Sequence, residues 1–326
     1  MSEKFSRRDA LKISAAAVAA AFAPSALAQS DASLRLIVTF PPGGSTDITA
    51  RIIQPRLAEK AGRPVVVENK PGAASQVGTQ FVARAAPDGN TVLVCFDTHA
   101  INPIAKKSLP YDTFKDFVGV TLAVRFPLVI AASAQTPGND LKEFLAAAKQ
   151  SPGKFSYAST GVGSMNHLVA EDLKRQAGVD LLHVPYGGGG PAVQAVLGNT
   201  VNLTMLSYAA LRSNIAAGKI KALAVTGTRR LADLPNVPTV VESGFAGFEA
   251  YSWIGIFAPS ATPAPVVRKL TEDFQGALRH PEVNSKLTEA GFEVMATDGP
   301  ALDRYAREQH DRWAAFVKRT GLKMEE

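Results

Sequence analysis

Short apolar runs alternate along this chain with longer stretches in which apolar residues recur at helical spacing. This alternation is typical of α/β units with mainly parallel strands. The apolar runs predict strands at residues 34–40, 65–68, 91–96, 118–123, 128–132, 155–158, 181–184, 201–206, 222–226 and 252–258. Helical spacing predicts helices at residues 141–150, 164–177 and 191–198, and the tail after Pro263 is predicted to be all helix.

The predicted elements fall into two domains. About 298 residues follow residue 28, and a chain of that length favours two domains. No tandem repeat or low-complexity linker separates the halves, so we expect the chain to cross between them twice, near residues 124–127 and 249–253. This predicts a discontinuous first domain, residues 29–124 plus 252–326, and a second domain at residues 125–251.

Residues 1–28 have the composition of an export signal. The run SRRDALK precedes an Ala-rich apolar stretch, and the sequence ALA that ends at Ala28 fits a small-x-small cleavage site. Arg7 and Arg8 resemble a twin-arginine signal, although Ala10 stands where such signals usually have Phe, so the general secretory route stays open. A membrane anchor is the weaker alternative, because about 20 apolar residues are needed to span a bilayer. We therefore expect cleavage after Ala28 and a periplasmic protein.

The net charge of the chain is small for its length. The formal net charge is +6, and it falls to +4 without the four basic and two acidic residues of the expected signal. No stretch clusters basic residues with aromatic ones, which argues against a nucleic-acid partner. Cys95 is the only cysteine, so no intrachain disulfide can form, and its apolar neighbours predict a buried, inert thiol.

The loop PPGGSTD follows the first predicted strand and precedes a helix. The first turn of a helix leaves backbone N–H groups without intrahelical partners, and the helix dipole places partial positive charge there. Gly43 and Gly44 would let an anion approach the backbone closely, while Ser45, Thr46 or Asp47 would cap the helix. Taken alone, the loop is also compatible with a plain connecting turn.

Two further loops have the same character: STGVGSMNH at residues 159–167 and PYGGGGPA at residues 185–192. Each follows a predicted strand and opens a helix, and ligands of open α/β sheets bind at the carboxyl ends of strands. Three such helix starts favour a ligand site over three plain turns. Because neither PPGGSTD nor STGVGSMNH contains Arg or Lys, we expect backbone N–H groups to bind an anion without a metal or cofactor.

The known catalytic and cofactor-binding motifs are mostly absent from the sequence or incomplete in it. The chain has no G-x-S-x-G elbow and no phosphate-binding G-x-x-x-x-G-K-[ST] loop, and its five histidines lack metal-ligand spacing. Residues 187–192 satisfy G-x-G-x-x-A, but the next strand ends at Ser207 instead of the ribose-binding acid. For His167, a hydrogen bond to the neighbouring loop is favoured over general-base chemistry. An exported hydrolase or isomerase that uses His167 with Ser164 or Thr160 stays open as an alternative.

Several segments together resemble the Bug family, the extracytoplasmic solute receptors of tripartite tricarboxylate transporters. They occur in order and cover essentially the whole chain after residue 28. The segments are IVTFPPGGSTDITAR, VVVENKPGAASQVGTQFVARAAPDGNTVL, the pair Asn102-Pro103, LPYDTFKDF, STGVGSMNH, HVPYGGGGPA, GKIKALAVTGTRR, LPNVPTVVESG and GIFAPSATP. The resemblance implies a two-domain Venus-flytrap fold of the periplasmic-binding-protein type, with a ligand cleft between two mainly parallel sheets flanked by helices.

The resemblance also implies a non-enzymatic function and a set of ligand contacts. The receptor would be a monomer that binds a small organic acid through backbone N–H groups and passes it to a two-subunit membrane permease. The acid would be a dicarboxylate or tricarboxylate, an amino acid or an aromatic carboxylate. A receptor that signals to a sensor kinase is the alternative. One jaw of the site would comprise Phe40, Pro42, Gly43, Gly44, Ser45, Thr46 and Asp47, with Asp47 mainly a helix cap. The other would comprise Ser159, Thr160, Gly161, Gly163, Ser164 and His167, with Tyr186 and Gly187 nearby.

Departures from the family pattern bear on which acid is bound. Ser75 replaces a common Gly, Asp97 lies in a stretch that varies among members, and Asn202 stands where an acid is frequent. We expect these positions to border the pocket. The candidates for contacts beyond the carboxylate are Ser75, Asp97, Tyr208 and Trp253, together with Phe40 and Tyr186. Plain packing is the alternative for each aromatic side chain and for Asp97.

Overall fold

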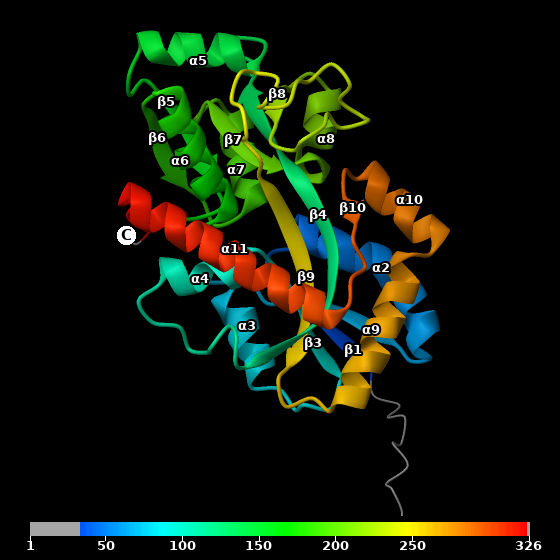
Figure 1. The fold of residues 1–326 in the computed structure, drawn as a ribbon. Coiled ribbons are helices and arrows are strands. Elements are labelled where there is room, and N and C mark those ends of the chain that lie inside the picture. The colour runs from blue at the N-terminus through cyan, green and yellow to red at the C-terminus, as the bar shows by residue number, and fades with distance from the viewer. Residues whose placement is uncertain (1–32, 325–326) are drawn as a thin grey trace, which may run out of the picture.

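A ten-stranded sheet with helices on both faces forms the framework of the computed structural model, which describes residues 33–324 (Figure 1). The strands are β1 (Leu34–Val38), β2 (Val65–Asn69), β3 (Thr91–Phe96), β4 (Phe117–Ser133), β5 (Phe155–Ser159), β6 (Leu181–Pro185), β7 (Leu203–Ser207), β8 (Ile220–Val225), β9 (Tyr251–Pro259) and β10 (Glu293–Val294). The helices are α2 (Ser45–Ala61), α3 (Gln76–Ala83), α4 (Thr98–Ala105), α5 (Leu141–Gln150), α6 (Met165–Ala177), α7 (Gly189–Leu197), α8 (Tyr208–Ala216), α9 (Ala264–Leu278), α10 (Pro281–Glu289) and α11 (Gly299–Thr320). The predicted α/β class is confirmed.

The long strand β4 connects the two halves of the sheet. Residues 117–127 of β4 pair with β9, and residues 128–133 pair with β7 and β8. The sequence predicted two separate strands here, and that prediction is wrong. Arg125 does not break the strand, because its guanidinium pairs with Glu293 at 2.8 Å and lies over the Tyr251 ring. Pro127 is tolerated because it falls where the pairing with β9 ends.

Strand direction differs between the outer and the central strands. The pairs β1–β2, β1–β3, β5–β6 and β5–β7 are parallel, as the alternating pattern predicted. All pairings of β4 and β9 are antiparallel, including their pairing with each other. The reason is topological: the chain leaves the first half along β4 and returns along β9, so these two strands run in opposite directions (Figure 1).

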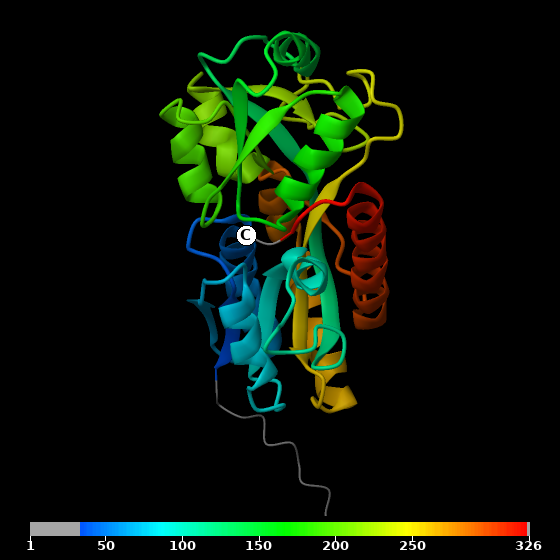
Figure 2. The ribbon, with the colours of Figure 1, turned by 90° about the vertical axis from the view of Figure 1, so that its left-hand side faces the viewer.

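Both faces of the sheet are buried under helices (Figure 2). In the second half, Ile130 of β4 packs in the cluster that contains α5 and α6 residues, whereas Val129 packs with residues of α7 and α8. In the first half, Leu36 of β1 shares a cluster with α2 and α9, whereas Ile37 packs with α3 and α11. Neighbouring residues of a strand point to opposite faces, so both must be apolar here. This explains why the strands appear in the sequence as continuous apolar runs.

The tail after Pro263 is not all helix. The two-residue strand β10 separates α10 from α11, and its Val294 pairs with Val124 of β4. The strand forms because Glu293 reaches the Arg125 guanidinium on β4, an interaction that no local pattern in the tail reveals.

Two sequence predictions concern the chain's first residues and its domain limits. The export signal at residues 1–28 lies outside the described residues. The domain limits after residues 124 and 251 remain a prediction. Across residues 33–324, every helix is too short or too polar to cross a membrane.

Candidate ligand-binding site

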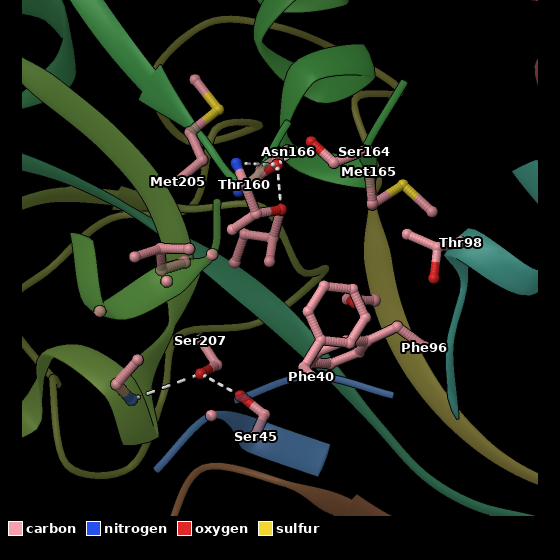
Figure 3. A pocket seen from close by; sticks show the side chains of 18 of the residues that line it. Phe40, Ser45, Phe96, Thr98, Thr160, Ser164, Met165, Asn166, Met205 and Ser207 are labelled. Carbon is pink, nitrogen blue, oxygen red and sulfur yellow. Dashed lines mark hydrogen bonds between the residues drawn. The ribbon is translucent and has the colours of Figure 1, made fainter. Parts of the chain in front are cut away.

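A cavity of about 390 Å³ lies between the two halves, at the carboxyl ends of β1, β3, β5 and β7 (Figure 3). Loops from both halves form its walls. The first half contributes Phe40, Pro41, Pro42, Gly43, Gly44, Ser45, Phe96, Asp97, Thr98, Phe126 and Ser252. The second half contributes Leu128, Thr160, Ser164, Met165, Asn166, Gly188, Gly189, Gly190, Pro191, Met205, Leu206, Ser207 and Ala210.

Five helices begin at this cavity. The sequence predicted three of these helix starts, those of α2, α6 and α7, and the structure adds α4 and α8. The added starts border the cavity through Thr98, the first residue of α4, and Ser207, which caps α8 with its side chain. First-turn N–H groups have no intrahelical acceptor, and the dipoles of the five helices place positive electrostatic potential in the cavity that their starts border. The arrangement suits a negatively charged ligand.

Charged side chains contribute little to the walls. Of the residues that line the cavity, Asp97 alone is ionisable, and none is Lys, Arg or His. The other polar atoms come from Ser, Thr and Asn side chains and from the backbone. An anion bound here would be held by neutral donors, as the absence of basic residues from the loops predicted.

The first loop is held in shape by Asp47. One carboxylate oxygen of Asp47 accepts a hydrogen bond from the Gly43 N–H at 3.0 Å, and the other accepts one from Asn69 at 3.0 Å. Arg51 adds an ion pair at 2.9 Å. Burial opposes the ionised form, but the hydrogen bonds from Arg51, Gly43 and Asn69 outweigh it and lower the pKa of Asp47. Asp47 therefore anchors the loop from behind the cavity.

Helix capping differs from the prediction. The N-cap of α2 is Gly44, without a side-chain hydrogen bond, so none of Ser45, Thr46 and Asp47 is the N-cap residue. Ser45 points into the cavity instead (Figure 3). Thr46 is fully buried and does not line the cavity. The extended conformation and missing side chain of Gly44 leave the start of α2 open to the cavity.

We expect Asp47→Ala to lower the free energy of unfolding by about 1–3 kcal/mol at pH 7, because it removes the carboxylate that accepts the part-buried hydrogen bonds of Gly43 and Asn69. A carboxyl group with a lowered folded-state pKa stabilises fully above its unfolded pKa of about 3.9. That contribution is lost as the pH falls through the lower folded-state value. Urea unfolding at pH 7 and pH 3 measures both effects. In the control Arg51→Ala, which removes a half-exposed partner, a loss below about 1 kcal/mol is expected.

The second loop is organised by Asn166, which the sequence did not single out. Its side-chain oxygen accepts hydrogen bonds from the Thr160 N–H at 3.3 Å, the Thr160 hydroxyl at 3.2 Å and the Ser164 hydroxyl. Thr160, Ser164 and Asn166 all line the cavity (Figure 3). Asn166 follows the N-cap of α6 by two residues, so an amide in the first turn after a Gly loop is the signal that would have found it.

Three predicted residues of the second loop lie behind the cavity wall. His167 Nδ1 accepts a hydrogen bond from the Gly163 N–H at 3.2 Å, and the His167 ring stacks on His183 with centroids 4.1 Å apart. Burial lowers the pKa of His167, so the ring is neutral near pH 7. Ser159 is fully buried and hydrogen-bonds His183 Nε2 at 2.6 Å. The hydrogen bond predicted for His167 is confirmed, and Nδ1 is not available as a base for Ser164 or Thr160.

The remaining predicted contacts belong to a neighbouring cavity of about 740 Å³. Gly161, Tyr186 and Gly187 line that cavity, together with Ser75. It shares Phe40, Pro41 and Thr160 with the first cavity, so these three residues form a partition between the two. In the third loop, the glycines after Gly187 border the first cavity in place of Tyr186 and Gly187.

The two halves touch across the cavity. Ser45 of α2 and Ser207 before α8 share a hydrogen bond of 2.6 Å between their hydroxyl oxygens (Figure 3). On another side, a Cβ at Gly163 would lie 2.6 Å from the Cβ of Ala105, the last residue of α4. Only glycine fits at that contact, and its φ of +78° favours glycine as well. The loops PPGGSTD and STGVGSMNH therefore each contact an element of the other half.

The four specificity candidates have different positions. Asp97 lines the first cavity, and Ser75 lines the second and hydrogen-bonds Thr98 at 3.2 Å. Trp253 is fully buried in the core cluster beneath α3 and α11, and Tyr208 lies in a separate depression beside Gly291, so neither side chain lines the first cavity.

Asn202 does not border the pocket either. It lies at the amino end of β7, and its side chain accepts a hydrogen bond from the Ser156 N–H at 2.9 Å. The cavity lies at the carboxyl end of the same strand, where Ser207 is found. An acid at position 202 would thus act on strand packing and not on the ligand.

Next to the predicted Phe40, apolar side chains that the sequence did not single out form much of the wall. Phe40 and Phe96 lie edge to face with centroids 5.1 Å apart, and Phe96 and Phe126 lie edge to face at 6.2 Å. Phe96 is the last residue of β3, and Phe40 follows β1 by two residues. Leu128, Met165, Met205 and Leu206 complete the apolar surface. The position of Phe96 at the carboxyl end of a central strand is the signal that would have identified it.

The fold defines the class: a two-domain fold of the periplasmic-binding-protein type. A solved structure of the periplasmic binding protein BugD is 35% identical to this chain, with a TM-score of 0.84 over 90% of this chain and 99% of that one. MatC from Rhodopseudomonas palustris with bound malate is 33% identical, with a TM-score of 0.81 over 87% of this chain and 98% of that one.

The family follows from the sequence comparison. The family model described as "Tripartite tricarboxylate transporter family receptor" matches residues 49–322, and the chain belongs to this family. A Pseudomonas relative, the UPF0065 protein in the tcbD-tcbE intergenic region, is 36% identical over 282 residues, 86% of this chain and 84% of the relative. The resemblance to the Bug receptors and the two-domain binding fold are confirmed.

Proposed function

We propose that this protein is a periplasmic receptor that captures a small carboxylated organic anion between its halves and delivers it to a two-subunit membrane permease. The observation that carries the proposal is the convergence of five helix N-termini on a cavity without Lys, Arg or His among its lining residues. The bound malate of the related MatC supports a carboxylate as the ligand. Export directed by residues 1–28 and a non-enzymatic, monomeric receptor are parts of the same proposal.

The residues proposed to contact the ligand are fewer than the sequence suggested. Those that line the first cavity are Phe40, Pro42, Gly43, Gly44, Ser45, Thr160 and Ser164, and the structure adds Asn166, Ser207 and the glycines at 188–190. Thr46, Asp47, Ser159, Gly163 and His167 are proposed to hold the loops in position. Gly161, Tyr186 and Gly187 are proposed to form part of the wall of the neighbouring cavity instead of contacting the ligand.

Backbone recognition is strong enough for a transport receptor. A hydrogen bond to a charged group contributes about 1.5–3 kcal/mol, and a favourable helix end up to about 2 kcal/mol. At the stronger end of these ranges, four or five such contacts supply the roughly 8 kcal/mol that micromolar binding requires, and the cost of association and domain closure subtracts from their sum.

We expect at least one small organic acid to raise the melting temperature of the purified protein. Ligand carried over from cells must first be removed by dialysis in denaturant and refolding, because a bound ligand would mask the shift. A thermal-shift screen of monocarboxylates, dicarboxylates, tricarboxylates and amino acids, followed by calorimetry, provides the measurement. If the stripped protein refolds and no organic anion binds it, the proposed function is wrong.

A further inference from the structure

Asp97 is a buried carboxyl group in the wall of the proposed ligand site. It lies between β3 and α4, is 3% exposed and lines the first cavity. The Ser252 hydroxyl, which reaches it from β9, donates a hydrogen bond to Oδ2. Burial raises the pKa of Asp97 to about 7, against the opposing effects of Ser252 and of the backbone N–H groups of Trp253 and Thr98. The carboxyl group is therefore half ionised near neutral pH, in a space that a ligand would fill.

No cation of the described chain compensates this charge. Among residues 33–324, no Lys, Arg or His forms an ion pair with Asp97, and none lines the cavity. The titratable groups that interact with it are the Cys95 thiol of β3 and the Tyr305 phenol of α11. Burial raises the pKa of both, that of Tyr305 to about 12, so both are neutral near pH 7. A ligand that closed the cavity without a cation would leave the Asp97 charge buried and unpaired.

The wall beside Asp97 is aromatic. Phe96 precedes Asp97 directly, and its ring contacts those of Phe40 and Phe126. The electron-rich faces of aromatic rings attract cations, and they recognise ammonium groups in other proteins. Figure 3 shows Phe40 and Phe96 on the side of the pocket where α4 begins at Thr98. A carboxylate and three aromatic rings thus form one region of the cavity, next to the helix N-termini that favour an anion.

We propose that the ligand is a zwitterion, a carboxylate that also carries a cationic nitrogen, and that Asp97 contacts this nitrogen. The inference rests on the proposed function, because it assigns a second charged group to the same ligand. The helix N-termini bind the carboxylate, and Asp97 with the phenylalanine rings binds the nitrogen. Amino acids and betaines have this chemistry. Dicarboxylates do not, because their second carboxylate would face Asp97 with like charge.

Matched ligand pairs test the inference. Glycine betaine and 3,3-dimethylbutanoate have the same shape, but only the betaine has a charged nitrogen. Leucine has an amino group that 4-methylpentanoate lacks. In 4-aminobutyrate the group opposite the carboxylate is an ammonium group, whereas in succinate it is a second carboxylate. By calorimetry on the stripped protein at pH 8, we expect at least one zwitterion to bind ten times more tightly than its partner. Asp97→Asn should remove that preference. Mass spectrometry of the ligand retained from cells should find a compound with a cationic nitrogen, either an amine or a quaternary ammonium group.

The pH profile provides a readout that needs no variant. Because a cationic nitrogen pairs only with ionised Asp97, the preference for the zwitterion should fall by up to about tenfold per unit of pH below the Asp97 pKa. The inference would be overturned if carboxylates without a cationic nitrogen bound more tightly than every zwitterion, and if their affinity rose further in Asp97→Asn or at pH 5. The proposed function would still stand in that case. A retained ligand without nitrogen would overturn it as well. If no organic anion binds at any pH, the proposed function itself fails.

Discussion

Replacing Gly44 with valine is expected to weaken carboxylate binding at least a hundredfold and to leave the fold intact. Gly44 is the N-cap of α2 and lines the cavity. Its backbone, at φ −77° and ψ 166°, is in the extended region that valine prefers, and an added Cβ would meet the Pro41 carbonyl oxygen at an ordinary 3.5 Å. The valine methyl groups would cover the N–H groups that the helix start presents. A hundredfold loss corresponds to about 2.7 kcal/mol, which one or two hydrogen bonds to a charged ligand supply.

The comparison variants separate blocked binding from altered folding. Gly44→Ala adds only the Cβ and should retain most of the affinity, whereas Gly276→Val on α9 meets only the flexible Lys60 side chain and should bind normally. Gly43 and Gly161 are unsuitable, because their φ values of +82° and +126° would strain any other residue. Calorimetry with the acid found in the screen gives the affinities, and thermal melts report the fold. Full affinity in Gly44→Val would show that the carboxylate does not bind at the start of α2.

The part of the site that could be predicted from the sequence consists of the three glycine-rich loops. PPGGSTD, STGVGSMNH and PYGGGGPA stand out because the same glycine-rich turn between a predicted strand and a helix occurs three times. The starts of α4 and α8 have no glycine: Asp97 joins β3 directly to α4, and Ser207 ends β7 and caps α8. Both starts reach the cavity only because their strands lie beside β1 and β5 in the sheet. Strand order is a property of the whole fold, and a local pattern does not contain it.

The crossing strands show the same limit. Nearly all residues of strands β4 and β9 are buried, on one face of the sheet or on the other. In β9, Ser252 faces the cavity and hydrogen-bonds Asp97, whereas its neighbour Trp253 points to the opposite face. Without the register of β9 against β3 and β4, the sequence does not say which of the two faces the ligand. The prediction chose the larger side chain, and the smaller one lines the site.

Truncating Trp253 should therefore unfold the protein more readily without changing which ligands it selects. Trp253 of β9 is fully buried among residues of β3, β9 and α11, edge to face with Tyr305 at 5.7 Å. Removing a buried aromatic side chain costs about 3–5 kcal/mol, through lost apolar burial and the cavity it leaves. We expect Trp253→Ala to lower the free energy of unfolding by that amount in urea titrations. Its ligand preferences should match those of the unaltered protein at temperatures where the variant remains folded.

The variant Trp253→Phe distinguishes packing from a polar role of the indole. Within the described residues, the buried indole N–H of Trp253 has no hydrogen-bond partner, so its removal deletes no bond. Phenylalanine keeps most of the apolar surface next to Tyr305 and should cost less than about 2 kcal/mol, because only the second ring is lost. A stable Trp253→Ala protein with altered ligand selection would instead assign Trp253 to the site. If Trp253 only packs in the core, stability should fall slightly in Trp253→Phe and further in Trp253→Ala, while the order of ligand affinities stays unchanged. The reason is that the side chain lies on the face of β9 opposite Ser252 and the cavity.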